Sequence, residues 1–316
     1  MSMLSRLRDW SGLSGWSGLS GWSGWSVRPR LDPRWVERVR RRYEIDAGYA
    51  DYHALCRSRF ARAAFEGPAP LLEQGRELLR VLDDSTAREI ERDIETRFRC
   101  HPTLAKSRHL ERFDVDDEAW SRDLLERIVT QEVDERAARF FGSEYFVYWY
   151  HITRATPVRE LGLNSFRWHC DRGPVGHLKL LLYLNGREEH GGGTEFLDLE
   201  TTRGLEASGY VFAPVKTRVI DLAPIAERSG VPYAPWSPEM RAGEGILFQP
   251  ANVLHRGMLP THGRRHVITV CLLPSPIPWR DAYDRARQLR EHGYDKWHEN
   301  AAQLREALAG VLPANA

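Results

Sequence analysis

Hydrophobic residues follow a helical period in the first part of the chain, an alternating period from about residue 145, and a helical period again after residue 278. Ala87, Ile90, Ile94 and Phe98 recur every three or four positions, which predicts an amphipathic helix. A second helical pattern spans residues 117–141. Both helices have one apolar stripe, so we expect them to pack against the outer face of a β-sheet.

Helix starts can also be predicted from capping residues. Asp32 followed by Pro33 is typical of a helix N-terminus, and predicts a helix over residues 34–44. Another helix is expected over residues 47–65. Residues 83–86 are expected to cap the helix with the Ala87 stripe, and Thr86 with Glu89 fits a capping box.

From Tyr145 onward the pattern favours strands. Phe146, Tyr148 and Tyr150 alternate with their neighbours, and further short strands follow as far as Leu273, separated by Gly, Pro and Asn turns. Many short strands in this order predict a two-sheet jelly roll, or double-stranded β-helix. The expected fold class is therefore α+β with a mainly β core, flanked by helices and extended by helices at both ends.

Composition divides the chain further. Residues 1–30 form a low-complexity Trp/Gly/Ser tail with tandem WSGLSG units, interpreted as a disordered tail or as a docking segment. Residues 31–77 are expected to be a helical extension, 78–278 the jelly-roll domain, and 279–316 a C-terminal helical segment that Gly293 interrupts. The proline-rich stretch 201–240 is expected to be an insertion between core strands that forms a lid.

Charge and cysteine content exclude some classes of protein. The 316 residues carry a formal net charge of +1, which gives no reason to expect a nucleic-acid partner. The four cysteines show no metal-binding or disulfide spacing, which favours a reducing, cytoplasmic setting. No apolar run reaches the ~18 residues of a membrane span, and no secretory signal is recognisable at the N-terminus. The oligomeric state is not indicated.

The strongest candidate chemistry is a possible metal site. His169 and Asp171 are two residues apart, and on an extended strand such residues point to the same side. His255 is a candidate third ligand further along the chain. Two histidines and one carboxylate on one face of a metal are the ligand set of non-haem Fe(II) oxygenases. The alternative is a surface turn at residues 169–171 and an unrelated buried histidine.

Several short motifs follow these residues in a fixed order. Tyr183 opens a Tyr-Leu-Asn triplet, a glycine cluster at 191–193 leads to Thr194, and a Gly-x-Gly-x-Leu-Phe strand precedes His255. In this order the motifs resemble those of the Fe(II)/2-oxoglutarate dioxygenase superfamily, and most closely its prolyl-4-hydroxylase-like branch. The resemblance covers roughly residues 78–274.

The resemblance implies 2-oxoglutarate as co-substrate, whose far carboxylate needs a fixed cation. Arginine suits it because its planar guanidinium meets a carboxylate with two parallel hydrogen bonds. Arg264 and Arg265 are both candidates, and the resemblance selects Arg265, on the strand face that also carries Thr269. Further co-substrate-binding residues are then Tyr183, by analogy with the family, and Phe166 as a pocket wall. The alternatives are a surface ion pair for Arg265 and an ordinary core position for Tyr183.

The implied activity is hydroxylation of an unactivated C–H bond in an amino-acid, peptidyl or other small-metabolite substrate. It would consume O2, release succinate and CO2, and need Fe(II), 2-oxoglutarate and, as an optional reductant, ascorbate. Two other classes stay open: a non-catalytic jelly-roll binding protein, and a cupin-like metalloenzyme that does not use 2-oxoglutarate.

Other polar residues near these motifs have weaker signals. Lys179 shares the strand face of Tyr183, and we expect it at the strand end facing solvent unless an acidic group pairs with it. Cys170 should face away from the metal, and His190 is expected to be a simple loop residue. Three arginines flank the candidate ligands and are expected at the surface or against an anionic substrate: Arg167, Arg172 and Arg256.

Overall fold

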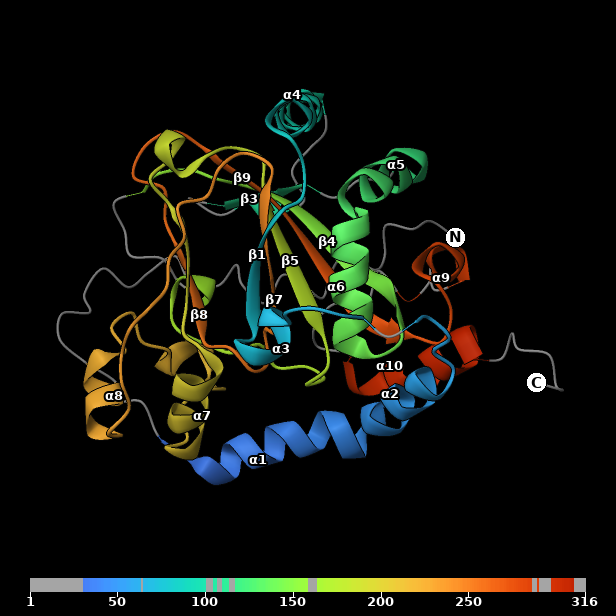
Figure 1. The fold of residues 1–316 in the computed structure, drawn as a ribbon. Helices are drawn as coiled ribbons and strands as arrows, with labels where there is room; N and C mark the ends of the chain where they lie inside the picture. Colours follow the sequence, from blue (N-terminus) through green and yellow to red (C-terminus); the bar gives the residue numbers. More distant parts are fainter. Residues whose placement is uncertain are drawn as a thin grey trace, which may run out of the picture.

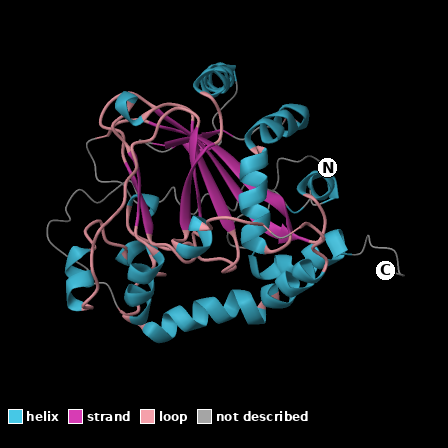
Figure 2. Cartoon of the chain, in the orientation of Figure 1, coloured by secondary structure: helices cyan, strands magenta, loops and turns pink. Residues whose placement is uncertain are grey.

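A seven-stranded antiparallel sheet forms the centre of the protein (Figure 1, Figure 2). The computed structural model describes residues 31–63, 65–100, 105–106, 110–113, 117–158, 164–285, 289 and 297–309. The predicted tail at 1–30 and Gly293 lie outside the described residues. In the sheet the strands have the order β1 (Arg76–Arg80), β7 (Glu244–Phe248), β5 (Leu178–Tyr183), β9 (Arg265–Ser275), β4 (Glu144–Ala155), β3 (Leu110–Phe113) and β2 (Ala105–Lys106).

A smaller layer lies against one face of this sheet. It consists of β6 (Gly193–Phe196) paired with β8 (His255–Met258), and single bridges add His169 beside β8 and Trp236 beside β6. The Phe196 ring packs edge-on against Phe248 of the large sheet, with ring centroids 5.1 Å apart. The architecture is therefore mixed helix and sheet with a large antiparallel sheet, as expected, and the second layer is short over the described residues.

Helices cover the opposite face of the large sheet (Figure 1). They are α4 (Asp84–Cys100), α5 (Glu118–Ile128), α6 (Gln131–Phe141) and α9 (Trp279–Arg285). The predicted stripe from Ala87 to Phe98 is buried, and it packs in one cluster with Leu178, Leu180 and Leu182 of β5. Because successive strand residues face opposite sides, β5 and β9 bury apolar residues on both faces.

Two predictions about helices differ from the structure. The stretch 117–141 is two helices, because the Thr130 side chain accepts a hydrogen bond from the Val133 backbone N–H and starts α6 anew. At α4 the cap is Asp83, whose carboxylate accepts from the backbone N–H of Thr86 at 2.8 Å. Thr86 donates its own hydroxyl to Asp83 instead of capping, so the capping box with Glu89 is wrong.

The N-terminal extension folds as α1 (Pro33–Arg41), a π-helical turn η3 (Arg42–Asp46) and α2 (Tyr49–Ser58). Asp32 caps α1 as predicted, accepting from the Trp35 N–H at 3.3 Å. The helix expected over 47–65 begins at Tyr49 and ends at Ser58. The chain then leaves the helix where Arg62 forms ion pairs with Asp134 and Glu144.

The extension contacts the loops that lead to the candidate ligands. Arg40 of α1 donates to Glu206 at 2.7 Å and to Asn252 at 3.1 Å. Glu44 accepts from the Val175 backbone N–H at 2.6 Å. Figure 1 shows α1 and α2 running beneath the sheet, so this extension supports the loops next to the candidate ligands.

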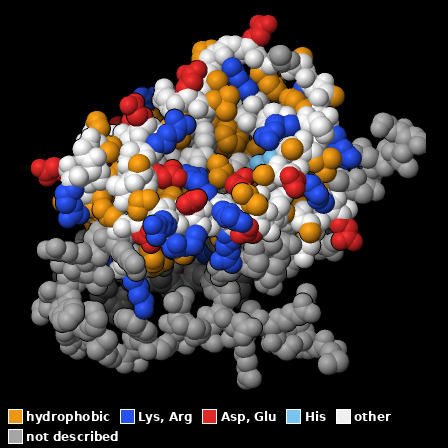
Figure 3. All heavy atoms as spheres, turned by 90° about the horizontal axis from the view of Figure 1, so that it is seen from below, with side chains coloured by type: hydrophobic (Ala, Val, Ile, Leu, Met, Phe, Trp, Pro, Cys, Tyr) orange, Lys and Arg blue, Asp and Glu red, His pale blue; other side chains and the backbone are white. Residues whose placement is uncertain are grey.

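Charges of both signs are intermixed on the face seen from below (Figure 3). Two exposed arginines of α1 have acidic neighbours: Arg38 lies 3.6 Å from Asp32, and Arg41 lies 3.4 Å from Asp46. The arginine-rich sequence of this helix therefore gives a solvated, charge-balanced surface.

The remaining elements are short. The stretch expected as an insertion at 201–240 contains most of α7 (Leu199–Ala207), then η6 (Val215–Thr217) and α8 (Ala223–Arg228). After α9, the described C-terminal residues form α10 (Trp297–Leu304) and η9 (Arg305–Ala309), within the helical segment predicted from residue 279 onward. Three further short elements are α3 (Pro70–Glu73), η4 (Asn164–Phe166) and η5 (Arg187–Glu189). Within the described ranges, no helix combines the length and apolar character that crossing a bilayer needs.

Candidate metal and co-substrate site

His169, Asp171 and His255 come together between the two layers. One ligand atom from each lies within 4.8 Å of the others. His169 Nε2 is 3.5 Å from Asp171 Oδ1, and His255 Nε2 is 3.9 Å from Asp171 Oδ2. Strand alternation, which predicted that His169 and Asp171 share a side, agrees with this arrangement.

Backbone carbonyls orient both imidazoles. His169 Nδ1 lies 2.7 Å from the Arg167 carbonyl oxygen, and His255 Nδ1 lies 2.9 Å from the Val253 carbonyl oxygen. Since a carbonyl only accepts, each Nδ1 carries the proton. Each Nε2, on the side of Asp171, therefore keeps its lone pair. This is the tautomer that a histidine needs in order to bind a metal through Nε2.

The protonation states of the three residues also suit a cation. Burial lowers the pKa of His255 to about 3 and also lowers that of His169, so both rings are neutral near pH 7. Burial by itself would raise the pKa of the Asp171 carboxyl, but the charge of Lys179 holds that pKa well below its usual value. Neutral imidazoles and an ionised carboxylate are the forms that bind metal.

Lys179 lies inside the site, and the expectation that it faces solvent is wrong. Its side chain is 8% exposed, and its ammonium forms an ion pair with Asp171 Oδ2. The ammonium also lies over the Trp149 ring, 5.1 Å from its centroid. The shared face with Tyr183 was readable from the sequence, but the acidic partner was not.

The inner face of the large sheet extends from this cluster to Arg265. Lys179 pairs with Cys271 across β5 and β9, Leu181 with Thr269, and Tyr183 with Val267. Thr269 therefore lies between the levels of Lys179 and Tyr183. Arg265 is four residues from Thr269, about 13 Å along a strand that rises roughly 3.3 Å per residue.

Arg265 is a buried cation without a carboxylate partner in the described part of the chain. It is 8% exposed, and its Nη1 donates to the carbonyls of Gly193 and Met258, both at 2.7 Å. Its Nε has no hydrogen-bond partner, and burial lowers its pKa. An unpaired buried donor on a guanidinium fits an anionic group of a ligand. Arg264, by contrast, has a side chain that is 56% exposed.

Tyr183 and His190 lie near Arg265. The Tyr183 hydroxyl hydrogen-bonds the Thr194 hydroxyl at 2.8 Å. His190 is in a loop, as expected, but it is fully buried, and its Nδ1 accepts from the Gly192 N–H at 2.9 Å. Burial lowers its pKa to about 4, so it is neutral and stabilises the loop without adding charge.

The other candidates are more peripheral. Phe166 packs so closely on Gly257 that a β-carbon there would lie 3.2 Å from its ring, which places it beside β8. Arg256 pairs with Glu195 at 2.5 Å, and Arg167 and Arg172 donate to backbone carbonyls. Cys170 is buried in the cluster that also contains Trp168 and Tyr210, apart from the cluster around Tyr183.

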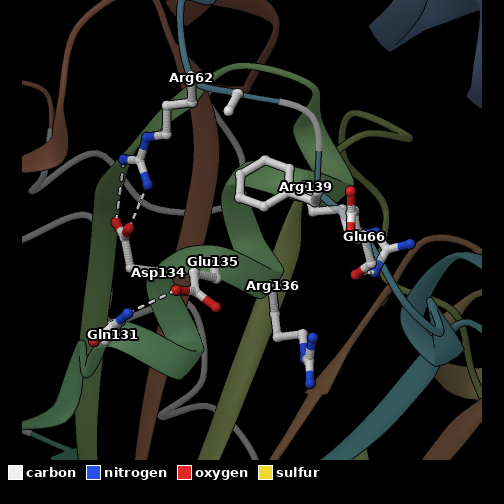
Figure 4. A pocket seen from close by; sticks show the side chains of 9 residues that line it. Arg62, Glu66, Gln131, Asp134, Glu135, Arg136 and Arg139 are labelled. Atoms are coloured by element: carbon white, nitrogen blue, oxygen red, sulfur yellow. Dashed lines mark hydrogen bonds and ion pairs between the residues drawn. The ribbon is translucent and has the colours of Figure 1, made fainter.

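A polar pocket of about 550 Å³ lies elsewhere, between residues 62–63 and 65–66 and helix α6 (Figure 4). Arg62 is bound to Asp134 there, and Arg139 donates to the carbonyls of Gly67 and Pro68, each at 2.6 Å. Its described lining includes none of the predicted site residues. Since these arginines are already paired with the protein, this pocket does not compete with the histidine site as a centre of chemistry.

Comparison with known proteins finds no matching family model and no matching curated protein. Among solved structures, the 2-oxoglutarate-dependent epimerase SnoN from nogalamycin biosynthesis is 14% identical, with 77% of this chain and 85% of that chain covered and a TM-score of 0.48. EctD from S. alaskensis is 15% identical over 78% of this chain and 82% of its own, with a TM-score of 0.47. HygX from Streptomyces hygroscopicus, solved with nickel and 2-oxoglutarate, is 16% identical over 66% and 86%, with a TM-score of 0.40. Because these TM-scores are below 0.5, the functional argument below rests on this chain's own residues.

Proposed function

We propose that this protein is an Fe(II)- and 2-oxoglutarate-dependent oxygenase of the double-stranded β-helix class. The observation that carries the proposal is that two complementary sites lie between the two layers. One is the cluster of His169, Asp171 and His255, whose ligand atoms lie within 4.8 Å of one another. The other is the buried Arg265 guanidinium, whose Nε has no partner. A metal at the first site and a carboxylate at the second suit the two ends of a chelating 2-oxo dicarboxylate.

Each residue has a defined role in this proposal. His169 and His255 would bind the metal through Nε2, since their Nδ1 atoms are occupied by carbonyls. Asp171 would complete a facial triad and leave the other positions open. Arg265 would hold the far carboxylate, with the Tyr183 hydroxyl beside it. Thr269 lies on the same strand face between them, and Phe166, beside β8, would contribute to the wall.

Bound Fe(II) and 2-oxoglutarate would supply, with O2, the oxidising power for attack on a C–H bond, and would leave succinate and CO2. We propose hydroxylation of an amino-acid, peptidyl or other small-metabolite substrate, and assignment to the prolyl-4-hydroxylase-like branch, on the motif order from His169 to Arg265. A reducing, cytoplasmic setting is part of the proposal, because the four cysteines are free. Ascorbate is an optional reductant.

The test is anaerobic binding followed by turnover. Purified protein should bind one Fe(II) per chain, and added 2-oxoglutarate should produce the weak visible charge-transfer band of a chelate. On exposure to O2 it should form succinate, first slowly and then faster with a suitable substrate from an amino-acid, peptide and small-metabolite panel. Metal binding without a 2-oxoglutarate band would favour the cupin-like alternative, and no metal binding would favour a binding protein.

A further inference from the structure

Lys179 is a charged residue of the inner face whose place in the site is not explained by the metal ligands or by Arg265. Its ammonium contacts Asp171 Oδ2, and its side chain is almost entirely removed from solvent. Two imidazoles that interact with it, His151 and His177, have pKa values lowered by burial to about 3 and about 4. The Asp171 carboxylate is in contact with the ammonium and supplies negative charge that compensates Lys179.

A buried ammonium is stable only when paired, and the same carboxylate is the proposed anionic ligand of the metal. Asp171 and Lys179 together carry no net charge. A divalent cation bound alone would leave two positive charges in a buried site, with an ammonium next to them. The dianionic co-substrate would bring one carboxylate to the metal and the other to Arg265, which lowers that excess, and an ammonium would attract it.

On this basis we propose that Lys179 couples metal retention to co-substrate binding. It weakens binding of the metal alone and strengthens binding of the metal together with the 2-oxo dicarboxylate. The inference rests on the proposed function, because it requires both ligands at this site. By thermodynamic linkage, the factor by which the co-substrate raises the affinity for the metal equals the factor by which the metal raises the affinity for the co-substrate.

The coupling can be measured with Mn(II), which reports metal binding without oxygen chemistry. Mn(II) affinity is determined by calorimetry and by the EPR signal of free Mn(II), at pH 7.5, with and without saturating 2-oxoglutarate. In the wild type, 2-oxoglutarate should strongly raise the affinity for Mn(II). In Lys179→Met, Mn(II) alone should bind at least tenfold more tightly than it binds to the wild type. The factor by which 2-oxoglutarate raises the Mn(II) affinity should be at least tenfold smaller than in the wild type.

Three variants separate charge from shape and folding. Lys179→Arg keeps the charge and should keep the wild-type coupling. Lys179→Gln also removes the charge and should give the same result as Lys179→Met. If the thermal midpoint shows that Lys179→Met is poorly folded, Lys179→Gln replaces it. Lys216→Met removes an exposed lysine and should leave both affinities unchanged.

The outcomes distinguish the inference from the function. If Lys179→Met and Lys179→Gln bind Mn(II) alone as weakly as the wild type or more weakly, with unchanged tightening by 2-oxoglutarate, Lys179 only orients Asp171 and the coupling is refuted. If the wild type binds no Mn(II), or binds it without any effect of 2-oxoglutarate, the proposed function itself fails.

Discussion

The backbones of His169 and His255 form a reciprocal pair of hydrogen bonds. The His169 N–H donates to the His255 carbonyl at 3.1 Å, and the His255 N–H donates back at 3.0 Å. Their rings lie with centroids 4.5 Å apart. This bridge joins two distant parts of the chain, so the spacing of the two residues is set by the main chain.

The first prediction follows from that bridge. His169→Ala and His255→Ala should each abolish Fe(II) binding and 2-oxoglutarate turnover while the sheet stays folded, because the backbone pairing remains. Asp171→Ala should abolish both as well, and should also lower the thermal midpoint because it leaves Lys179 without this carboxylate. Iron content, succinate formation and the thermal midpoint are the measurements. His262→Ala is the matched control, since His262 is exposed and bonds only to the neighbouring loop. Full activity in any triad variant would refute the ligand assignment.

A second prediction separates the adjacent arginines. Arg265→Ala should raise the 2-oxoglutarate concentration needed for half-maximal turnover by roughly 30-fold or more, since truncating one member of a buried charge pair costs about 2–5 kcal/mol. Arg264→Ala should change it less than about threefold, because Arg264 is exposed and pairs loosely with Glu95, 3.5 Å away. Initial rates against 2-oxoglutarate concentration measure both. A larger effect at Arg264 would place the co-substrate elsewhere.

A third prediction concerns stability and pH on the outer face of the sheet. Glu95 accepts hydrogen bonds from Arg154 at 2.9 Å and from His266 at 2.6 Å. Burial raises the pKa of Glu95, but these two partners outweigh it and lower the pKa below 4.5. A lowered folded-state pKa stabilises the protein above the unfolded-state pKa, and this contribution is lost as the pH falls through the folded value.

Glu95→Gln should therefore destabilise the protein by about 1 kcal/mol at pH 7. The difference from wild type should shrink steadily below pH 4.5. Chemical denaturation across pH 3–7 is the measurement. Glu89→Gln on the same helix is the control, because Glu89 is 63% exposed and should matter little. An effect of Glu95→Gln that did not depend on pH would mean that the carboxylate acts by shape alone.

The fourth prediction tests the N-terminal extension. Arg40→Ala removes the link from α1 to Glu206 and Asn252, and should cost about 1–3 kcal/mol of stability and weaken Fe(II) binding modestly, because Asn252 belongs to the turn that leads to His255. Arg38→Ala on the same helix should do little, since Arg38 has a 60% exposed side chain. Denaturation and iron titration compare the two. Equal effects would show that α1 contributes only apolar packing.

The tail needs a separate experiment. Deleting residues 1–30 should leave iron content, the thermal midpoint and basal succinate formation unchanged, since Asp32 already caps α1. Any loss should appear only in binding to a partner, a membrane surface or a large substrate. A truncated protein that lost iron or melted many degrees lower would show that the tail is part of the fold.

The sequence by itself determined which faces the strands present. Alternation correctly predicted that Arg265 points inward while Arg264 points outward, and that His169 and Asp171 share a side. It also placed strands at β4, β5, β7 and β9, and the buried stripe of α4. These are local properties, because a period of two or of 3.6 residues is fixed by the backbone of each element.

Only the tertiary structure decided which distant groups meet. Lys179 could be assigned to the inner face from the sequence, but its position in the site depends on a contact with Asp171 from another segment. The stretch after α2 shows the same, because Arg62, which was predicted to be helical, lies past the end of α2 and pairs with Asp134 and Glu144. The free energy of a buried charge depends on its partner, and partners distant in sequence leave no local pattern.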